Sequence, residues 1–321
     1  MIALWDTNAT EVANALATER HSAAGASGIA LNLVVVVNEQ NEREAEQALT
    51  IAAQQHPCRL LIVIRRDPQQ DNARVDAEIV VGGRLGPCEA VVLRVYGPLV
   101  RHSDSVVVPL LAPDVPVVTC WLSDAPPFTA QDPLGAFADR RITYSSRDSQ
   151  PIQALQQRAD DYTPGDTDLS WTRITYWRSL IASAFDTATA APASIEITAS
   201  ANDPSAVLLS GWLTSKLKVR PVITDTPVDR DSDHLPGIKA VAIDLSNDHQ
   251  IKIKRGEGGK TLLQRTGFPD RTQTINGREL GELLAEELRH LDPDQPYQSA
   301  LGEATNSQWL CNGDVAAVTS A

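Results

Sequence analysis

"GIALNLVVVVNEQNEREAEQALTIAAQQHPCRLLIVIRRD" (residues 28–67) contains two apolar, β-branched runs separated by a segment with a charged face. The runs at 28–37 and 58–67 are continuous rather than alternating, which is typical of strands buried on both faces of a sheet. The segment between them, 41–55, has helical spacing and a charged side. A strand, a helix and a second buried strand predict parallel pairing through a right-handed crossover.

The flanking sequence extends this α/β pattern across the first half of the chain. Upstream, Thr7 or Asn8 can cap a helix that runs to about Glu19. Downstream we expect an antiparallel hairpin at 74–97 with its turn at 82–87, and then a helical crossover at 102–113. A strand at 115–122, a proline-rich loop at 123–135 and a short strand at 140–146 are expected to follow. Residues 1–150 are therefore predicted to form an α/β domain whose mixed sheet is flanked by helices.

The second half has a different pattern. Helices are expected from Pro151, a strand at 192–200, and a helix from Asn202 or Asp203 to about 217. Short alternating strands at 250–274 are expected to form an antiparallel meander, and an amphipathic helix is expected at 276–291. The sequence thus predicts that residues 151–306 form a helical and α+β domain, which contains the antiparallel meander, and that residues 307–321 form a weakly ordered tail.

A tryptophan-rich segment, "PGDTDLSWTRITYWRSLIASAFD" (164–186), is predicted to be one helix that Asp166 or Thr167 caps. Apolar side chains cover more than half of its circumference, so we expect it to be mostly buried, where the two domains meet. Arg173 and Arg178 lie among these apolar side chains, where an unpaired guanidinium is costly. Their partners could be carboxylates of the chain, a bound anion or another protein, and we expect carboxylates of the chain. The candidate residues for partner binding or domain contact are Trp171, Arg173, Trp177 and Arg178, together with Arg140 and Arg141.

Charge and composition exclude several classes of partner. The chain of 321 residues has a formal net charge of −13 and no lysine among its first 215 residues. This acidity argues against nucleic acid and anionic membranes as partners. Because no signal peptide and no run of about 20 apolar residues is present, we expect a soluble, unexported chain.

Motifs for catalysis or cofactor binding are missing from the sequence. "KRGEGGKT" (254–261) resembles a phosphate loop, but Lys254 stands where the first glycine belongs, and the flanks predict a hairpin. No G-x-G-x-x-G or G-x-S-x-G occurs, and His56 is expected to cap or orient a loop. The spacing of Cys58, Cys88, Cys120 and Cys311 indicates reduced core thiols rather than a zinc site or a redox pair. We therefore expect no catalytic residue, metal or cofactor.

Several stretches resemble the bacterial glucose-6-phosphate dehydrogenase assembly protein family. The most specific is the tryptophan-rich segment at 164–186. Others are "LWDT" (4–7), "HPCRLLIVIRRD" (56–67), "DAEIVVGG" (76–83), "DPLGAFADRRIT" (132–143), "NDPSAVLLSGWL" (202–213) and "ELLAEELRHLDPDQPY" (282–297). The resemblance covers most of the chain.

The resemblance implies a cytoplasmic, non-catalytic protein that binds glucose-6-phosphate dehydrogenase and favours its active oligomer or state in the oxidative pentose phosphate pathway. It implies no catalytic residues that could be carried over to this chain. Two alternatives remain open at this point. One is a sugar-phosphate-binding enzyme that grips phosphate with clustered arginines, and the other is a metabolite sensor with a pocket but no catalytic groups.

Overall fold

The chain divides into two compact units that exchange segments of sequence. The first comprises Met1–Arg147, Gly165–Thr167 and Leu280–Pro293, and the second comprises Asp148–Pro164, Asp168–Glu279 and Asp294–Ala321. The structure is a computed structural model and describes residues 2–22, 28–82, 88–186, 188, 190–226, 237–274 and 277–307. Residues 83–87 of the turn predicted at 82–87, residues 308–321 of the tail predicted at 307–321, His234 and Cys311 lie outside the described residues, as do the side chains of His21 and Ser22.

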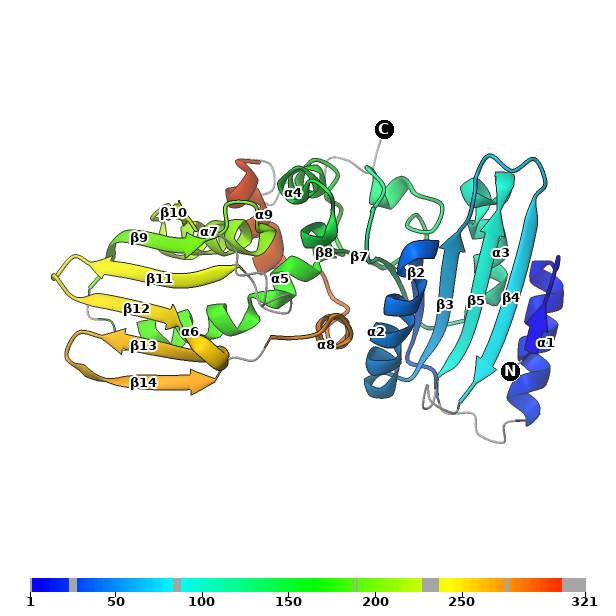
Figure 1. The fold of residues 1–321 in the computed structure, drawn as a ribbon, viewed down its shortest axis with the longest axis horizontal. Helices are drawn as coiled ribbons and strands as arrows, with labels where there is room; N and C mark the ends of the chain where they lie inside the picture. Colours follow the sequence, from blue (N-terminus) through cyan, green and yellow to red (C-terminus); the bar gives the residue numbers. More distant parts are fainter. Residues whose placement is uncertain are drawn as a thin grey trace. The chain divides into compact units, whose positions relative to one another are not determined.

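The first unit contains an eight-stranded mixed sheet with the strand order β1-β4-β5-β3-β2-β6-β7-β8 (Figure 1). Its strands are β1 (Ile2–Leu4), β2 (Leu31–Asn38), β3 (Cys58–Arg65), β4 (Arg74–Val81), β5 (Glu89–Tyr96), β6 (Val117–Trp121), β7 (Arg140–Thr143) and β8 (Asp166–Asp168). As predicted, β2 and β3 are parallel, and β4 and β5 form an antiparallel hairpin. The mixed sheet of the first domain is confirmed; β1, which pairs with β4, was not predicted.

Helices cover both faces of this sheet. Its helices are α1 (Ala9–Ser22), α2 (Glu42–Gln55), α3 (Asp104–Val107) and α8 (Leu280–Glu287). Val12 and Leu16 of α1 and Val107 of α3 share a core with alternate residues of the strands. Helix α2 buries its alanines and Leu49 on the sheet, and α8 packs against α2. Because the central strands are covered on both sides, their runs are apolar throughout.

The second unit contains a six-stranded sheet with the order β10-β9-β11-β12-β13-β14. Its strands are β9 (Pro192–Ala199), β10 (Val222–Asp225), β11 (Ile238–Leu245), β12 (Gln250–Arg255), β13 (Lys260–Arg265) and β14 (Phe268–Thr274), and its helices are α4 (Pro151–Asp160), α5 (Leu169–Arg173), α6 (Thr175–Phe185), α7 (Pro204–Leu217) and α9 (Gln295–Thr305). The predicted meander is confirmed in β12 to β14, and the predicted hairpin joins β12 to β13. Strands β10 and β11 and helix α9 were not predicted.

One close helix contact in the second unit depends on a glycine. Helices α7 and α9 pack together, and a Cβ atom at Gly211 would lie 2.0 Å from the carbonyl oxygen of Ala300. No side chain fits at that distance, so glycine is required where the two backbones approach. Among the described residues, no helix combines the length and the apolar composition that crossing a membrane requires.

Two predicted helices have different limits in the structure. The helix expected from Asp166 begins instead at Leu169, because residues 166–168 form strand β8, and Asp168 rather than Asp166 or Thr167 caps it by accepting from the Ser170 N–H at 2.9 Å. Ile174 then separates α5 from α6. The helix expected to reach residue 291 ends at Glu287. Residues 166–168 pair with a neighbouring strand of the sheet, and this pairing overrides their helical spacing. The local sequence pattern does not indicate such pairing.

The cap of α7 gives a testable prediction. Asp203 accepts a hydrogen bond from the Ser205 N–H at 2.9 Å and another from the Gly237 N–H. Replacing Asp203 with alanine is expected to lower the free energy of unfolding by about 1–2 kcal/mol. Asp203→Asn is the matched control, because asparagine caps helices equally well, and it should stay within about 0.5 kcal/mol of the wild type. Urea unfolding measures the free energy of unfolding of both variants. Equal losses in the two variants would show that the carboxylate charge of Asp203, rather than its cap of the helix, stabilises the protein.

Candidate functional site

Trp171 is at the centre of the tryptophan-rich segment and is 1% exposed. Its indole N–H donates to Asp294 Oδ2 at 2.8 Å, and its ring lies 6.0 Å from that of Tyr297. The guanidinium of Arg178 stacks over the indole, 3.6 Å from the ring centroid. Asp294 also caps α9 by accepting from the Tyr297 N–H. Trp171 therefore connects α5, α6 and the start of α9 within the second unit.

The other candidate residues of this segment occupy different environments. Trp177 is buried in the core of the second unit. Arg173 is half-buried at the end of α5, and Arg178 also donates to Thr175 Oγ1 at 3.1 Å. Tyr176 is 40% exposed, with the guanidinium of Arg278 over its ring. The expectation that this segment is mostly buried agrees with these positions; a role in domain contact or partner binding stays a prediction.

Arg140 is almost completely enclosed in the first unit. Its guanidinium forms an ion pair with Glu287 Oε1 at 2.7 Å and donates to the carbonyl oxygens of His290 and Asp292, the latter at 3.1 Å. The side chains of Arg140 and Glu287 are 2% and 9% exposed. These carbonyl groups follow the end of α8, so Arg140 satisfies backbone groups that a longer helix would have bonded itself.

Arg141, the neighbour of Arg140, has a separate set of partners. Its guanidinium pairs with Asp166 and donates to the carbonyl oxygen of Ala138 at 2.8 Å. Its backbone N–H bonds to the carbonyl oxygen of Gly165, which has φ of +97° and could not carry a side chain, because a Cβ would lie 2.4 Å from the Asp139 oxygen. Both arginines at 140 and 141 are thus neutralised by carboxylates of the same chain.

The carboxyl edge of the parallel strands is the usual ligand site of an open α/β sheet, at the point where strand order reverses. In this sheet the reversal lies between β2 and β6. There Asn38 donates to Asp124 Oδ2 at 2.6 Å, and Asn41 donates to Ser123 Oγ at 2.9 Å. The segment after β2 is a short 3₁₀ helix, Glu39–Asn41, instead of a glycine-rich turn. Sequence reasoning did not single out these side chains.

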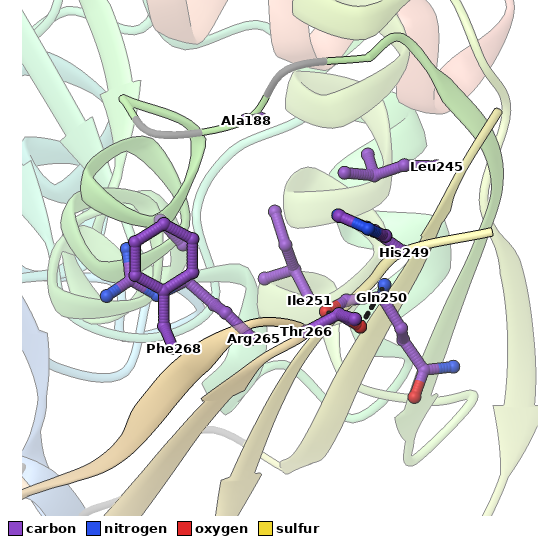
Figure 2. A pocket seen from close by; sticks show the side chains of 9 residues that line it. Ala188, Leu245, His249, Gln250, Ile251, Arg265, Thr266 and Phe268 are labelled. Atoms are coloured by element: carbon purple, nitrogen blue, oxygen red, sulfur yellow. Dashed lines mark hydrogen bonds between the residues drawn. The ribbon is translucent and has the colours of Figure 1, made fainter. Parts of the chain in front are cut away.

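A pocket of about 100 Å³ lies in the second unit and contains none of the six candidate residues (Figure 2). Ligand pockets usually measure 300–1,000 Å³, so this one is small. Arg265 lies over the ring of Phe268, 4.6 Å from the centroid, and Thr266 accepts from the Gln250 N–H at 2.9 Å. The lining comprises Ala184, Ala188, Leu245, His249, Gln250, Ile251, Arg265, Thr266 and Phe268.

His56 follows the last residue of α2, and its predicted role in capping or orienting a loop stays a prediction. Its Nε2 atom lies 2.7 Å from the carbonyl oxygen of Ala285 and so links the end of α2 to α8. Among the described residues, no group of three or more histidine, cysteine, aspartate or glutamate side chains could hold a metal ion.

Two cysteines that are 30 residues apart lie in contact, which their spacing did not predict. The Sγ atoms of Cys58 and Cys88 are 3.3 Å apart, because Cys58 begins β3 and Cys88 immediately precedes β5, the neighbouring parallel strand. The hydrogen bond with Cys88, together with burial, raises the pKa of the Cys58 thiol, and the same bond lowers the pKa of Cys88.

We expect neither thiol to react in the folded protein. Cys58 and Cys88 are 1% and 0% exposed, so a reagent reaches them only when the unit opens. Alkylation with iodoacetamide should be at least about 100-fold slower than in urea-unfolded protein. Mass spectrometry of the two peptides measures this, with the unfolded chain as the control. Rapid labelling of Cys88 without unfolding would contradict the burial of the pair.

Comparison with known proteins relates both halves of the chain to one family. Residues 49–160 match the glucose-6-phosphate dehydrogenase subunit N-terminal domain, and residues 164–301 match the C-terminal domain of the same subunit. The OpcA protein of Synechocystis sp., whose name refers to the OxPP cycle, is 29% identical over 254 residues, which are 74% of this chain and 50% of the relative. The chain thus spans about half the length of that curated relative.

Solved structures resemble the chain at the level of the fold. An oxidoreductase from Sinorhizobium meliloti superposes with a TM-score of 0.50 at 9% identity over 89% of this chain and 97% of its own. A 3-ketoreductase from Actinomadura kijaniata, in complex with NADP, gives 0.47 at 9% identity over 89% of this chain and 98% of its own.

By its fold, the molecule is thus a two-unit α/β protein with the architecture of that S. meliloti oxidoreductase. By its sequence, the chain belongs to the glucose-6-phosphate dehydrogenase assembly protein family.

Proposed function

We propose that this chain is a non-catalytic factor of the cytoplasm that binds glucose-6-phosphate dehydrogenase and favours its active oligomer or state in the oxidative pentose phosphate pathway. The observation that carries the proposal is the match of residues 49–160 and 164–301 to the two domains of the dehydrogenase subunit family. A protein contact that shifts an equilibrium must bind one state of the target more tightly than the others. We expect an interface above about 1,000 Å² in total.

The non-catalytic part of the proposal is supported by where the charged groups lie. Arg140 and Arg141 are held by Glu287, Asp166 and backbone carbonyls. Arg178 is stacked on Trp171. Gripping a phosphate would require Arg140 and Arg141 to leave buried partners, at a cost of several kcal/mol. The first βα connection also lacks the glycine fingerprint with which this type of sheet approaches a pyrophosphate.

A titration tests the proposal. The dehydrogenase encoded in the same genome is assayed at fixed concentration against increasing amounts of this chain, and apparent KM and kcat for glucose 6-phosphate are measured. A saturable fall in KM or rise in kcat, with a matching increase in dehydrogenase mass by light scattering, is the expected result. Unchanged kinetics and mass over the whole titration would overturn the proposal. Turnover of glucose 6-phosphate by this chain alone would overturn its non-catalytic part.

Metabolite sensing is the second candidate function, and the pocket beside Arg265 and His249 favours it. Its volume is below the usual range for ligand sites, and Arg265 is its one arginine, so a sugar phosphate would be poorly enclosed. Calorimetry with glucose 6-phosphate and the isolated chain decides between the two. Binding that is lost in Arg265→Gln would assign a sensor role to this pocket.

A further inference from the structure

The six-stranded sheet of the second unit has one buried face and one open face. The inward side chains of its strands belong to the core of that unit: Ile195, Ile197, Val241, Ile243, Ile253 and Leu263. Because side chains alternate along a strand, the residues between them point to the opposite side. On that side Glu196 and Lys254 are exposed, and Lys252 and Ala242 are half-buried. We call this side the open face.

The open face carries a mixture of opposite charges. Strand register places three lysines and three carboxylates on it: Lys252, Lys254, Lys260, Glu196, Asp244 and Asp270. Glu196 accepts from the hydroxyl of Thr224 at 2.7 Å, and Asp270 accepts from the amide of Gln264 at 2.9 Å. Both donors are neutral, so they do not compensate the negative charges. Such a mixed face favours neither a uniformly acidic nor a uniformly basic partner.

The opposite charges nearest the middle of the sheet lie on different sides of strand β11, which runs between β9 and β12 (Figure 1). Ala242 of β11 pairs with Glu196 of β9 on one side and with Lys252 of β12 on the other. In the next row, Ala240 pairs with Thr198 and with Lys254 in the same way. An acid on β9 and a lysine on β12 therefore lie at the same height along β11.

This arrangement is complementary to a second copy of itself. A two-fold axis parallel to β11, between two open faces, lays β11 over β11 and exchanges β9 with β12 and β10 with β13. Glu196 of each copy then faces Lys252 of the other, at two equivalent places. Lys260 faces the end of β10, where Asp225 is exposed. Asp244 of β11 lies one row from Lys252 of either copy, so lysines accompany the two carboxylates near the axis.

The shape of the open face fits the same arrangement. Only the short side chains of Ala240 and Ala242 separate the two central strands along the axis. Rotation about one of its own strands leaves the twist of a sheet unchanged, so the two curved faces follow each other. Five strands of each copy overlap, and strand spacing gives about 24 Å by 20 Å per copy, or about 1,000 Å² in total. This total reaches the lower limit for a specific interface.

We propose that two copies of this chain associate through the open face, with Glu196 of each copy paired to Lys252 of the other. The inference goes beyond the proposed function, because it concerns the chain by itself and does not depend on binding to the dehydrogenase. A contact of this size predicts a dissociation constant in about the micromolar range. Salt screens the charge pairs, so the dimer weakens as ionic strength rises.

The test uses two charge reversals, separately and mixed. Sedimentation equilibrium of the isolated full chain measures dimerisation over a wide range of concentration. Glu196→Lys and Lys252→Glu each bring like charges together at both places, so each variant should dimerise at least about tenfold more weakly than the wild type. In a mixed dimer of the two variants, opposite charges meet again at both places. The equimolar mixture should therefore dimerise within about threefold of the wild type, and native mass spectrometry with a tag on one variant identifies the mixed dimer.

Matched controls change the same charges elsewhere. Asp71→Lys and Arg43→Glu lie at exposed positions of the first unit, and each should dimerise within about threefold of the wild type. Circular dichroism checks that every variant is folded. If a reversal disturbs folding, Glu196→Gln and Lys252→Gln replace it and should each lose at least about threefold in affinity.

The other outcomes overturn the inference in distinguishable ways. A wild-type chain that stays monomeric at every concentration overturns it and leaves the proposed function standing. A dimer that neither reversal weakens uses another surface. Weakened variants whose mixture does not recover overturn the pairing of positions 196 and 252, and equal losses in the controls attribute association to net charge. A monomeric wild type whose two reversals lose binding to the dehydrogenase would assign the open face to that partner instead.

Discussion

Replacing Arg140 with leucine is expected to lower the free energy of unfolding of the first unit by about 3–5 kcal/mol. The reason is the partner left behind, because Glu287 is 9% exposed and would keep a buried charge with no cation beside it. The carbonyl oxygens of His290 and Asp292 would lose their donor as well. Urea unfolding followed by tryptophan fluorescence measures the change, since Trp121 lies in the core of the same unit.

Arg147→Leu is the matched control. It removes the same side chain from an ion pair with Glu44 that is 34% and 50% exposed, where such pairs contribute about 0.2–1 kcal/mol. Arg140→Leu combined with Glu287→Leu should recover part of the loss, because it removes the uncompensated charge. If Arg140→Leu costs no more than Arg147→Leu, the buried pair is not what anchors α8 to the first unit.

Replacing Trp171 with alanine is expected to lower the free energy of unfolding of the second unit by about 3–5 kcal/mol. The substitution removes a side chain that is 1% exposed and leaves a cavity beside Tyr297. It also removes the donor to Asp294 and the surface on which Arg178 stacks. Trp171→Phe should cost less, about 1–3 kcal/mol, because most of the apolar volume remains and the hydrogen bond does not.

Tyr176→Ala provides the control for Trp171. Tyr176 is an aromatic residue of the neighbouring helix α6 and is 40% exposed, so its loss should stay within about 1 kcal/mol. Activation of the dehydrogenase should fall with stability in Trp171→Ala and recover at low temperature, where the variant is folded. Lost activation in a variant of unchanged stability would instead assign Trp171 direct contact with the partner.

The strands and the helix within 28–67, and the start of α7, could be predicted because the signal for each of them lies within a few neighbouring residues. Continuous β-branched runs predicted β2 and β3, and a proline after Asp203 predicted the start of α7. The prediction was wrong where a distant strand intervened, at 166–168, since pairing with a neighbouring strand is not written in the local sequence. It also missed β1, β10 and β11, whose short or mixed runs are ambiguous without their partners.

The sequence alone determined the α/β and α+β classes of the two halves, the missing nucleotide loops and the family, because these depend on residue spacing and on motifs. Tertiary structure decided which charges are used internally. Arg140 meets a carboxylate 147 residues away, and Cys58 meets a thiol 30 residues away. Strand order and register bring such groups together, and they arise from the packing of the whole unit rather than from the residues beside each charge.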